Sequence, residues 1–216
     1  SRRHGPFLND SPYPEKSGLY LYLNTNKLGI TLNVEAKTGQ KMLKQLLKEA
    51  DVFVENNPPQ KMADLGLDYT SLKEVNPRLI VTSNTPYGQT GPYKDYKGHS
   101  LNTAGLGGQT MRTGEPEREP LAPPLSQSHY QSGAMAATAT MGAIFARSSS
   151  GEGQHVDISE AEIWATIHLG HGVHLGVFEG RKSIRSGHRT ISVYPWCILQ
   201  CKDGYMCLIA IQGFQW

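Results

Sequence analysis

The chain has 216 residues, of which 38% are hydrophobic and 19% charged, and its formal net charge is +2. A charge this small gives no basis for binding nucleic acid or an anionic membrane. No apolar stretch reaches the roughly 18 residues that a membrane span needs. We therefore expect a globular protein with a hydrophobic core and with neither a nucleic acid nor a membrane as partner.

The cysteines and the chain ends add two expectations. Cys197, Cys201 and Cys207 are odd in number and lack CxxC spacing, which favours reduced thiols and a cytoplasmic location. The chain starts at SRRHGPF without Met and stops inside the apolar segment IAIQGFQW. We expect it to be an internal piece of a longer protein.

The first half of the chain predicts a strand–helix–strand unit. Apolar residues recur at helical spacing over residues 38–50, and the Val-rich run DVFVE at 51–55 is typical of a buried parallel strand. Two short helical pieces, broken by Gly66 and Pro77, precede a second buried strand, RLIVTS, at 78–83. This order predicts parallel pairing of the two strands.

The second half begins with a loop-rich stretch over residues 84–127, followed by a helix of small residues at 130–147. A short strand, HVDIS, and a second long helix, EAEIWATIHLGHGVHLGVF, come next. The runs 191–199 and 205–211 alternate in polarity around Lys202-Asp203-Gly204, which predicts a hairpin. We place a large α/β domain at 1–180, and a linker and the start of a smaller domain at 181–216.

Candidate site residues stand in the loops and at one helix start. His129 precedes the run of Ala, Gly, Met and Thr, and polar side chains follow the predicted strands. Loops after the carboxyl ends of parallel strands carry the sites of many α/β proteins. Such residues are also often merely solvated, so both interpretations stay open for Asn56, Asn57, Lys61, Lys97, His99 and His129.

Other patterns favour structural roles. GLGG at 105–108 lacks the spacing of a dinucleotide fingerprint, so a tight helix end is expected there. His168, His171 and His174 have no carboxylate one turn away, which favours packing or surface histidines over a metal site. The acids Glu152, Asp157, Glu160 and Glu162 are interpreted mostly as solvated charge and a helix-start signal. No Ser-His-Asp order or GxSxG elbow is present in the sequence.

Several segments in order resemble family III CoA-transferases, the group that includes formyl-CoA transferase, carnitine CoA-transferase and α-methylacyl-CoA racemase. They are SRRHGPF, LYLNTNKLGITLN, ADVFVENNPPQKMADLGLDYTSLKEVNPRLIV, PYGQTGPY, the small-residue helix ending in AR, and SGEGQHVDISEAE. The resemblance implies a Rossmann-like large domain with a parallel sheet, a smaller second domain, and a dimer with interlocked chains.

The resemblance also implies that coenzyme A or an acyl-CoA binds as substrate, without a metal. Asn56 and Lys97 match residues near CoA, and Asn57 stands where the family commonly has Phe. Lys61 and Leu65 complete the set expected to contact CoA. Asp64 stands where the family often has an arginine, and an acid there would repel a CoA phosphate.

His129 is the main departure, because the transferases have an aspartate there that attacks the acyl-CoA carbonyl. Imidazole can attack a thioester too, but it cannot form the thioester with CoA that follows in the family's scheme. His99 lies in GHSLN, which resembles the segment that carries the catalytic histidine of the racemases.

Three hypotheses follow from the resemblance. The first is a CoA-transferase that uses His129 in an altered scheme to move CoA between an acyl-CoA and a small carboxylic acid. The second is an epimerase that moves an α-proton between His99 and His129, and an imidazole suits that task near neutral pH. The third is a non-catalytic subunit paired with an aspartate-bearing homologue. The protein is accordingly expected to form a homodimer or such a heterodimer.

Overall fold

The computed structural model of the chain describes residues 2–167, 173–181, 184–189 and 194–210. The chain forms two compact units, Ser1–Gly39 and Gln40–Trp216. The domain boundary predicted near residue 180 stays a prediction.

The first unit is built from short turns around one buried serine. It contains 3-10 turns at Leu8–Asp10 and Pro14–Lys16 and a helix, α1, at Gly18–Leu23. Ser17 is fully buried, donates to the carbonyl of His4 at 2.6 Å, and accepts from the backbone N–H of Tyr20 at 3.2 Å. The hydroxyl therefore caps α1 and ties its start to the preceding segment.

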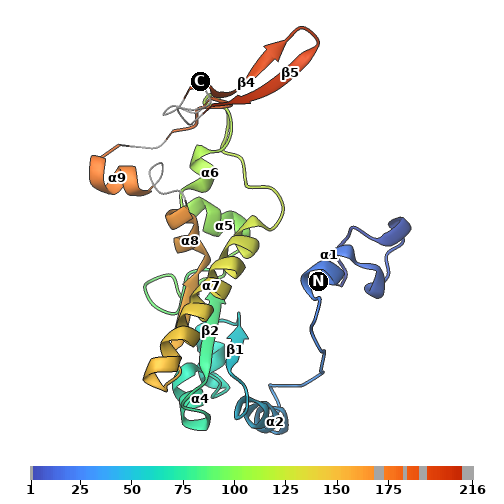
Figure 1. Ribbon diagram of the computed structural model, residues 1–216, viewed down its shortest axis with the longest axis vertical. Coiled ribbons are helices and arrows are strands. Elements are labelled where there is room, and N and C mark those ends of the chain that lie inside the picture. Colours follow the sequence, from blue (N-terminus) through green and yellow to red (C-terminus); the bar gives the residue numbers. More distant parts are fainter. Residues whose placement is uncertain (1, 168–172, 182–183, 190–193, 211–216) are drawn as a thin grey trace. The chain divides into compact units, whose positions relative to one another are not determined.

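A parallel sheet of three strands in the order β1-β2-β3 forms the centre of the second unit (Figure 1). The strands are β1 at Val52–Glu55, β2 at Ile80–Thr85 and β3 at His155–Ser159. β2 lies in the middle and is buried along most of its length. The two predicted strands of the first half and the predicted strand HVDIS are thus confirmed, as is their parallel pairing. The expected burial is found for β2 but is wrong for β1, which lies at the edge of the sheet with Val54 62% exposed.

Helix α2, at Lys37–Leu47, precedes β1. The connection from β1 to β2 contains α3 at Pro59–Asp64 and α4 at Tyr69–Val75. The side-chain amide of Asn76 donates to carbonyls of Leu47, Lys48 and Ala50, so it binds the end of α2 beside the start of β2. The two predicted helical pieces between the strands are confirmed.

The second connection holds α5 at Ser100–Leu106, α6 at Gln109–Arg112 and the 24-residue helix α7 at Gln127–Ser150. α7 packs along β2 and β3 (Figure 1). Hydrogen bonds fix this packing, since Thr82 Oγ1 lies 2.7 Å from Thr140 Oγ1 and Asn84 donates to Ser132 Oγ at 3.1 Å. Small residues on this face let the helix approach the sheet closely. The helix extends three residues beyond each end of the expected span at 130–147.

The remaining elements are α8 at Glu160–Ile167, α9 at Val173–Glu179, and a hairpin of β4 at Trp196–Cys201 and β5 at Gly204–Ile209. The predicted hairpin is confirmed around Lys202-Asp203, although residues 191–193 and 211 of the expected strands lie outside the described part. The α/β fold with a parallel sheet agrees with the prediction. Within the part of the chain that the structure describes, no helix combines the length and the apolarity needed to cross a membrane.

Candidate active site

The starts of three helices meet beyond the carboxyl ends of the strands. Ser100 is the first residue of α5, His129 is the third of α7, and Glu160 is the first of α8, directly after β3. The three helices pack against one another in pairs. Residues far apart in sequence are therefore brought to one edge of the sheet, where α/β folds place their sites.

His129 lies between a carboxylate and a hydroxyl. Its Nδ1 is 2.9 Å from Glu160 Oε1, and its Nε2 is 3.4 Å from Ser100 Oγ. A carboxylate only accepts hydrogen bonds, so Nδ1 is the donor in this pair, and in the tautomer that has its one proton on Nδ1 the lone pair of Nε2 faces the hydroxyl. The His129 side chain is 58% exposed, which leaves the ring open to a substrate.

Glu160 is the residue that the sequence interpretation missed. Its side chain is only 6% exposed, and its Oε2 accepts a hydrogen bond from Thr103 Oγ1 at 3.4 Å. Glu160 does begin α8, as expected for a helix-start acid, but the expectation that its charge is solvated is wrong for this residue. A buried carboxylate needs a partner because the loss of water is otherwise uncompensated, and His129 and Thr103 supply it.

Buried hydrogen bonds also hold the backbone of the site in place. Ser128 Oγ accepts from the Trp164 indole N–H at 2.7 Å and donates to the carbonyl of Ser100 at 3.1 Å. Gly107 permits the contact of α5 with α8, because a Cβ there would meet the Cβ of Trp164 at 2.3 Å. The expected helix end at GLGG is confirmed, since α5 ends just before Gly107.

His99 is the N-cap residue of α5 and is exposed. Its backbone N–H donates to Asn102 Oδ1 at 3.0 Å, and its carbonyl accepts from the N–H groups of Asn102 and Thr103. In the described structure the His99 and His129 rings share no hydrogen bond, and the contacts of His129 go to Ser100 and Glu160 instead. The pairing of the two histidines in catalysis stays a prediction.

The five residues predicted to contact CoA lie at and near the end of β1 and in the loop after β2. Asn56 is exposed and follows β1, while Asn57 is half-buried and donates through its backbone N–H to Glu55 Oε2 at 2.7 Å. Lys61 is exposed on α3, and Leu65 is the C-cap residue of that helix. Lys97 is exposed in the loop before α5.

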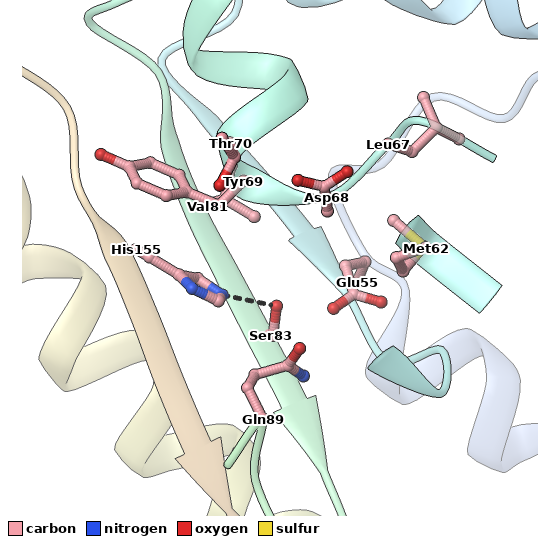
Figure 2. Close-up of a pocket in the computed structure, with 10 residues that line it drawn as sticks. All are labelled: Glu55, Met62, Leu67, Asp68, Tyr69, Thr70, Val81, Ser83, Gln89 and His155. Atoms are coloured by element: carbon pink, nitrogen blue, oxygen red, sulfur yellow. Dashed lines mark hydrogen bonds between the residues drawn. The ribbon is translucent and has the colours of Figure 1, made fainter. Parts of the chain in front are cut away.

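A separate pocket of about 160 Å³ lies on the face of the sheet opposite α7. Thr82 and Asn84 bond to α7, so the alternating residues Val81 and Ser83 face the other way and line the pocket. Figure 2 shows the imidazole of His155 beside the Ser83 hydroxyl, with the carboxyl groups of Glu55 and Asp68 farther across the pocket. None of the five predicted CoA contacts is among its lining residues, and two carboxylates would repel the phosphates of CoA.

Hydrogen bonds and burial set the charges of this pocket. Burial alone would raise the pKa of Asp68, but the hydroxyl and N–H of Ser71 both donate to this carboxylate, and its pKa lies below the usual value. The pKa of His155 is lowered by burial, which outweighs the opposing effect of Asp157, Glu55 and Asp68. The Tyr69 ring stacks on His155 at a centroid distance of 5.3 Å. His155 is therefore neutral at physiological pH and serves as a packed part of the pocket wall.

Groups of three or more metal-binding side chains are not found among the described residues. His168 and His171, two of the three histidines considered for a metal, lie outside those residues. The side chain of the third, His174, is not described either.

Comparison with known sequences gives a consistent result. The model of CoA-transferase family III matches residues 1–216. Subunit BbsE of succinyl-CoA:(R)-benzylsuccinate CoA-transferase from Thauera aromatica is 34% identical over 98% of this chain and 51% of its own length. Succinate–glutarate CoA-transferase from Agrobacterium fabrum is 30% identical over 94% of this chain and 51% of its own length. The chain thus spans about half the length of these curated relatives.

Solved structures agree with the fold. A CAIB/BAIF family protein from Brucella suis superposes with a TM-score of 0.83 at 31% identity, covering 97% of this chain and 55% of that one. The arrangement of β1, β2 and β3 with the surrounding helices is therefore shared with experimentally determined members of that group.

Proposed function

The chain belongs to CoA-transferase family III, and from this premise we propose that the whole protein moves CoA between an acyl-CoA thioester and a small carboxylic acid. The names of two relatives support this substrate class, because they pair succinate with glutarate and succinyl-CoA with benzylsuccinate. Both reactions exchange one carboxylic acid for another on CoA.

The observation that carries the proposal is the exposed imidazole of His129 held through Nδ1 by the buried Glu160. In the proposed scheme Nε2 attacks the thioester carbonyl, the C–S bond breaks, and CoA thiolate and an acyl-imidazolium result, with the Nδ1 proton still hydrogen-bonded to Glu160. The acceptor carboxylate then attacks this acyl group, the C–N bond breaks, and a mixed anhydride and neutral His129 result. CoA thiolate attacks the acceptor carbonyl of the anhydride, which yields the new acyl-CoA and the donor acid.

Glu160 contributes because its negative charge offsets the positive charge that develops on the ring when Nε2 acts as nucleophile. An acyl-imidazole is reactive enough to pass its acyl group to a carboxylate. In the aspartate scheme the enzyme itself forms a thioester with CoA, and an imidazole cannot form that intermediate. In the scheme proposed here, CoA thiolate attacks the anhydride directly instead.

The CoA moiety is proposed to lie across the loops after β1 and β2. Lys61 and Lys97 are exposed cations there, and they suit the phosphates of CoA as point charges. Asn56, Asn57 and Leu65 would contact the remainder of the cofactor. Asp64 lies on the same helix as Lys61 and accepts a hydrogen bond from Gln60 at 2.7 Å, so this carboxylate has a partner that moderates its repulsion of a phosphate.

A second candidate is a non-catalytic subunit of a two-chain transferase. It is favoured by the 34% identical relative from Thauera aromatica, which is named as a subunit, and by the histidine where the resemblance expects the nucleophilic aspartate. In that case an aspartate-bearing partner would supply the reactive group.

The test uses the full-length protein with succinyl-CoA and glutarate, and mass spectrometry follows the formation of glutaryl-CoA. Wild type is expected to form the new thioester, and His129→Ala is expected to lose the activity. If wild type is inactive alone, an aspartate-bearing homologue is added to wild type and to His129→Ala. Equal activity of the two mixtures would instead establish the non-catalytic subunit. Exchange of the substrate α-hydrogen in heavy water without glutaryl-CoA formation would contradict both and indicate the epimerase.

A further inference from the structure

We infer that Ser100, His129 and Glu160 form a nucleophile–base–carboxylate relay that hydrolyses acyl-CoA thioesters. Ser100 Oγ lies 3.4 Å from His129 Nε2, and His129 Nδ1 lies 2.9 Å from the buried Glu160. Serine relays are recognised by this geometry and these roles rather than by sequence order. The inference takes its substrate class from the proposed function but adds a different reaction.

The position of Ser100 is fixed by buried partners. Its carbonyl accepts from Ser128 Oγ at 3.1 Å, and Ser128 is 2% exposed and bound by the Trp164 indole. The backbone of Ser100 is thus held by a buried hydrogen-bond partner, and its hydroxyl faces the exposed ring of His129. A separation of 3.4 Å is at the long end of a hydrogen bond, and such contacts commonly tighten when a substrate binds.

The two half-reactions balance as follows. Ser100 Oγ attacks the thioester carbonyl while its proton moves to His129 Nε2. The C–S bond breaks, the leaving thiolate takes that proton, and free CoA and an acyl ester on Ser100 remain. A water molecule then gives a proton to Nε2 and attacks the ester carbonyl, the C–O bond breaks, and Ser100 regains its proton as the carboxylic acid leaves. In both steps Glu160 compensates the charge on the imidazolium.

The acyl-serine leads to hydrolysis because an ester is a weaker acyl donor than an anhydride. Attack of a carboxylate on the ester would form an anhydride, which is higher in free energy than the ester. Attack of water forms the carboxylic acid, which is lower in free energy. Acylation of Ser100 therefore diverts the acyl group from transfer, and acylation of His129 does not. The same imidazole serves as base in one reaction and as nucleophile in the other.

The first experiment treats the full-length protein with a fluorophosphonate, which reacts with serines that a neighbouring base activates, and locates the adduct by peptide mass spectrometry. Labelling is expected on Ser100, lost in Ser100→Ala and His129→Ala, and at least about tenfold slower in Glu160→Gln. Ser126 is the matched control, because it is exposed at the start of α7 and its side chain makes no capping hydrogen bond. Ser126→Ala should be labelled like wild type, and absence of label from Ser100 in wild type would overturn the relay.

The second experiment measures thiol release from succinyl-CoA without an acceptor acid. Ser100→Ala is expected to lose at least about 100-fold of this hydrolysis while melting at the temperature of wild type. Hydrolysis that survives in Ser100→Ala would place the acyl group on His129 and contradict the inference. Glutaryl-CoA formation is followed in parallel to separate the two hypotheses. Label on Ser100 without CoA transfer would contradict only the proposed function, and CoA transfer without label on Ser100 would contradict only the relay.

Discussion

Nδ1 of His129 lies 2.9 Å from Oε1 of Glu160 across 31 residues of sequence, and it joins a side chain that is 58% exposed to one that is 6% exposed. The buried member fixes the orientation and tautomer of the exposed one. Because Glu160 begins α8 directly after β3, the sheet itself sets the position of the imidazole.

Glu160→Gln should lower kcat of CoA transfer at least about tenfold with KM changed by less than about twofold. The amide keeps the shape and can still accept from Nδ1, but it no longer offsets positive charge on the ring. Steady-state kinetics with succinyl-CoA and glutarate measure the split between kcat and KM.

The matched control for this substitution is Glu152→Gln, since the Glu152 side chain is 67% exposed and pairs with Lys73 on the surface. It should leave both constants as in wild type. Equal loss in the two variants, or a loss in Glu160→Gln that is confined to KM, would show that Glu160 does not act through the imidazole.

The substitution His129→Asp should restore the carboxyl nucleophile that the family resemblance expects, and therefore raise transfer. The structure adds that the new carboxylate would face Glu160, so one of the two acids would be driven to take up a proton. We expect the double variant His129→Asp/Glu160→Gln to exceed His129→Asp in turnover by about tenfold, as measured by glutaryl-CoA formation at pH 7. A double variant slower than the single one would show that the two positions do not contact each other.

Sequence patterns were sufficient for the elements whose signal is local. The Val-rich run before Asn56 and the run around Ile80 predict strands, of which only the second is buried along most of its length. The small residues after His129 indicate a helix in close contact. Residue type and position also singled out His129. The resemblance then indicated the family, because several matching segments occur in the same order along the chain.

The partners of His129 were beyond the reach of such patterns. Glu160 stands in an EAE run that is typical of a solvated helix start, and Ser100 is one serine among many. Their roles arise only when α5, α7 and α8 pack with their starts together, which depends on contacts such as Gly107 against Trp164. Burial of a charged residue at a helix start is a property of tertiary packing, and a single sequence does not encode it locally.

Gly107→Ala should destabilise the protein by about 1–3 kcal/mol, because the added methyl would lie 2.3 Å from the Cβ of Trp164 and 2.7 Å from the carbonyl oxygen of Ala161. Gly142→Ala is the matched control, since Gly142 lies within α7 and a Cβ there meets no atom within 4 Å. It should stabilise by about 0.5–1 kcal/mol through helix propensity. Urea unfolding gives both free energies, and a neutral Gly107→Ala would contradict the close packing of α5 on α8.

The pocket beside β2 predicts a pH dependence of stability through His155, whose pKa burial lowers below 6.5. A histidine with a lowered pKa in the folded state binds a proton less readily there than in the unfolded chain. Its contribution is therefore complete above pH 6.5 and is lost as the pH falls toward and through the folded pKa. His155→Phe keeps an aromatic ring to stack on Tyr69 but loses the bond to Ser83 at 2.9 Å, which costs about 1 kcal/mol at pH 7.5. Urea unfolding at pH 7.5 and 5.5 should show a smaller drop in the variant than in wild type, since the titrating group is gone. An identical drop in both proteins would mean that His155 is protonated equally in the folded and unfolded states.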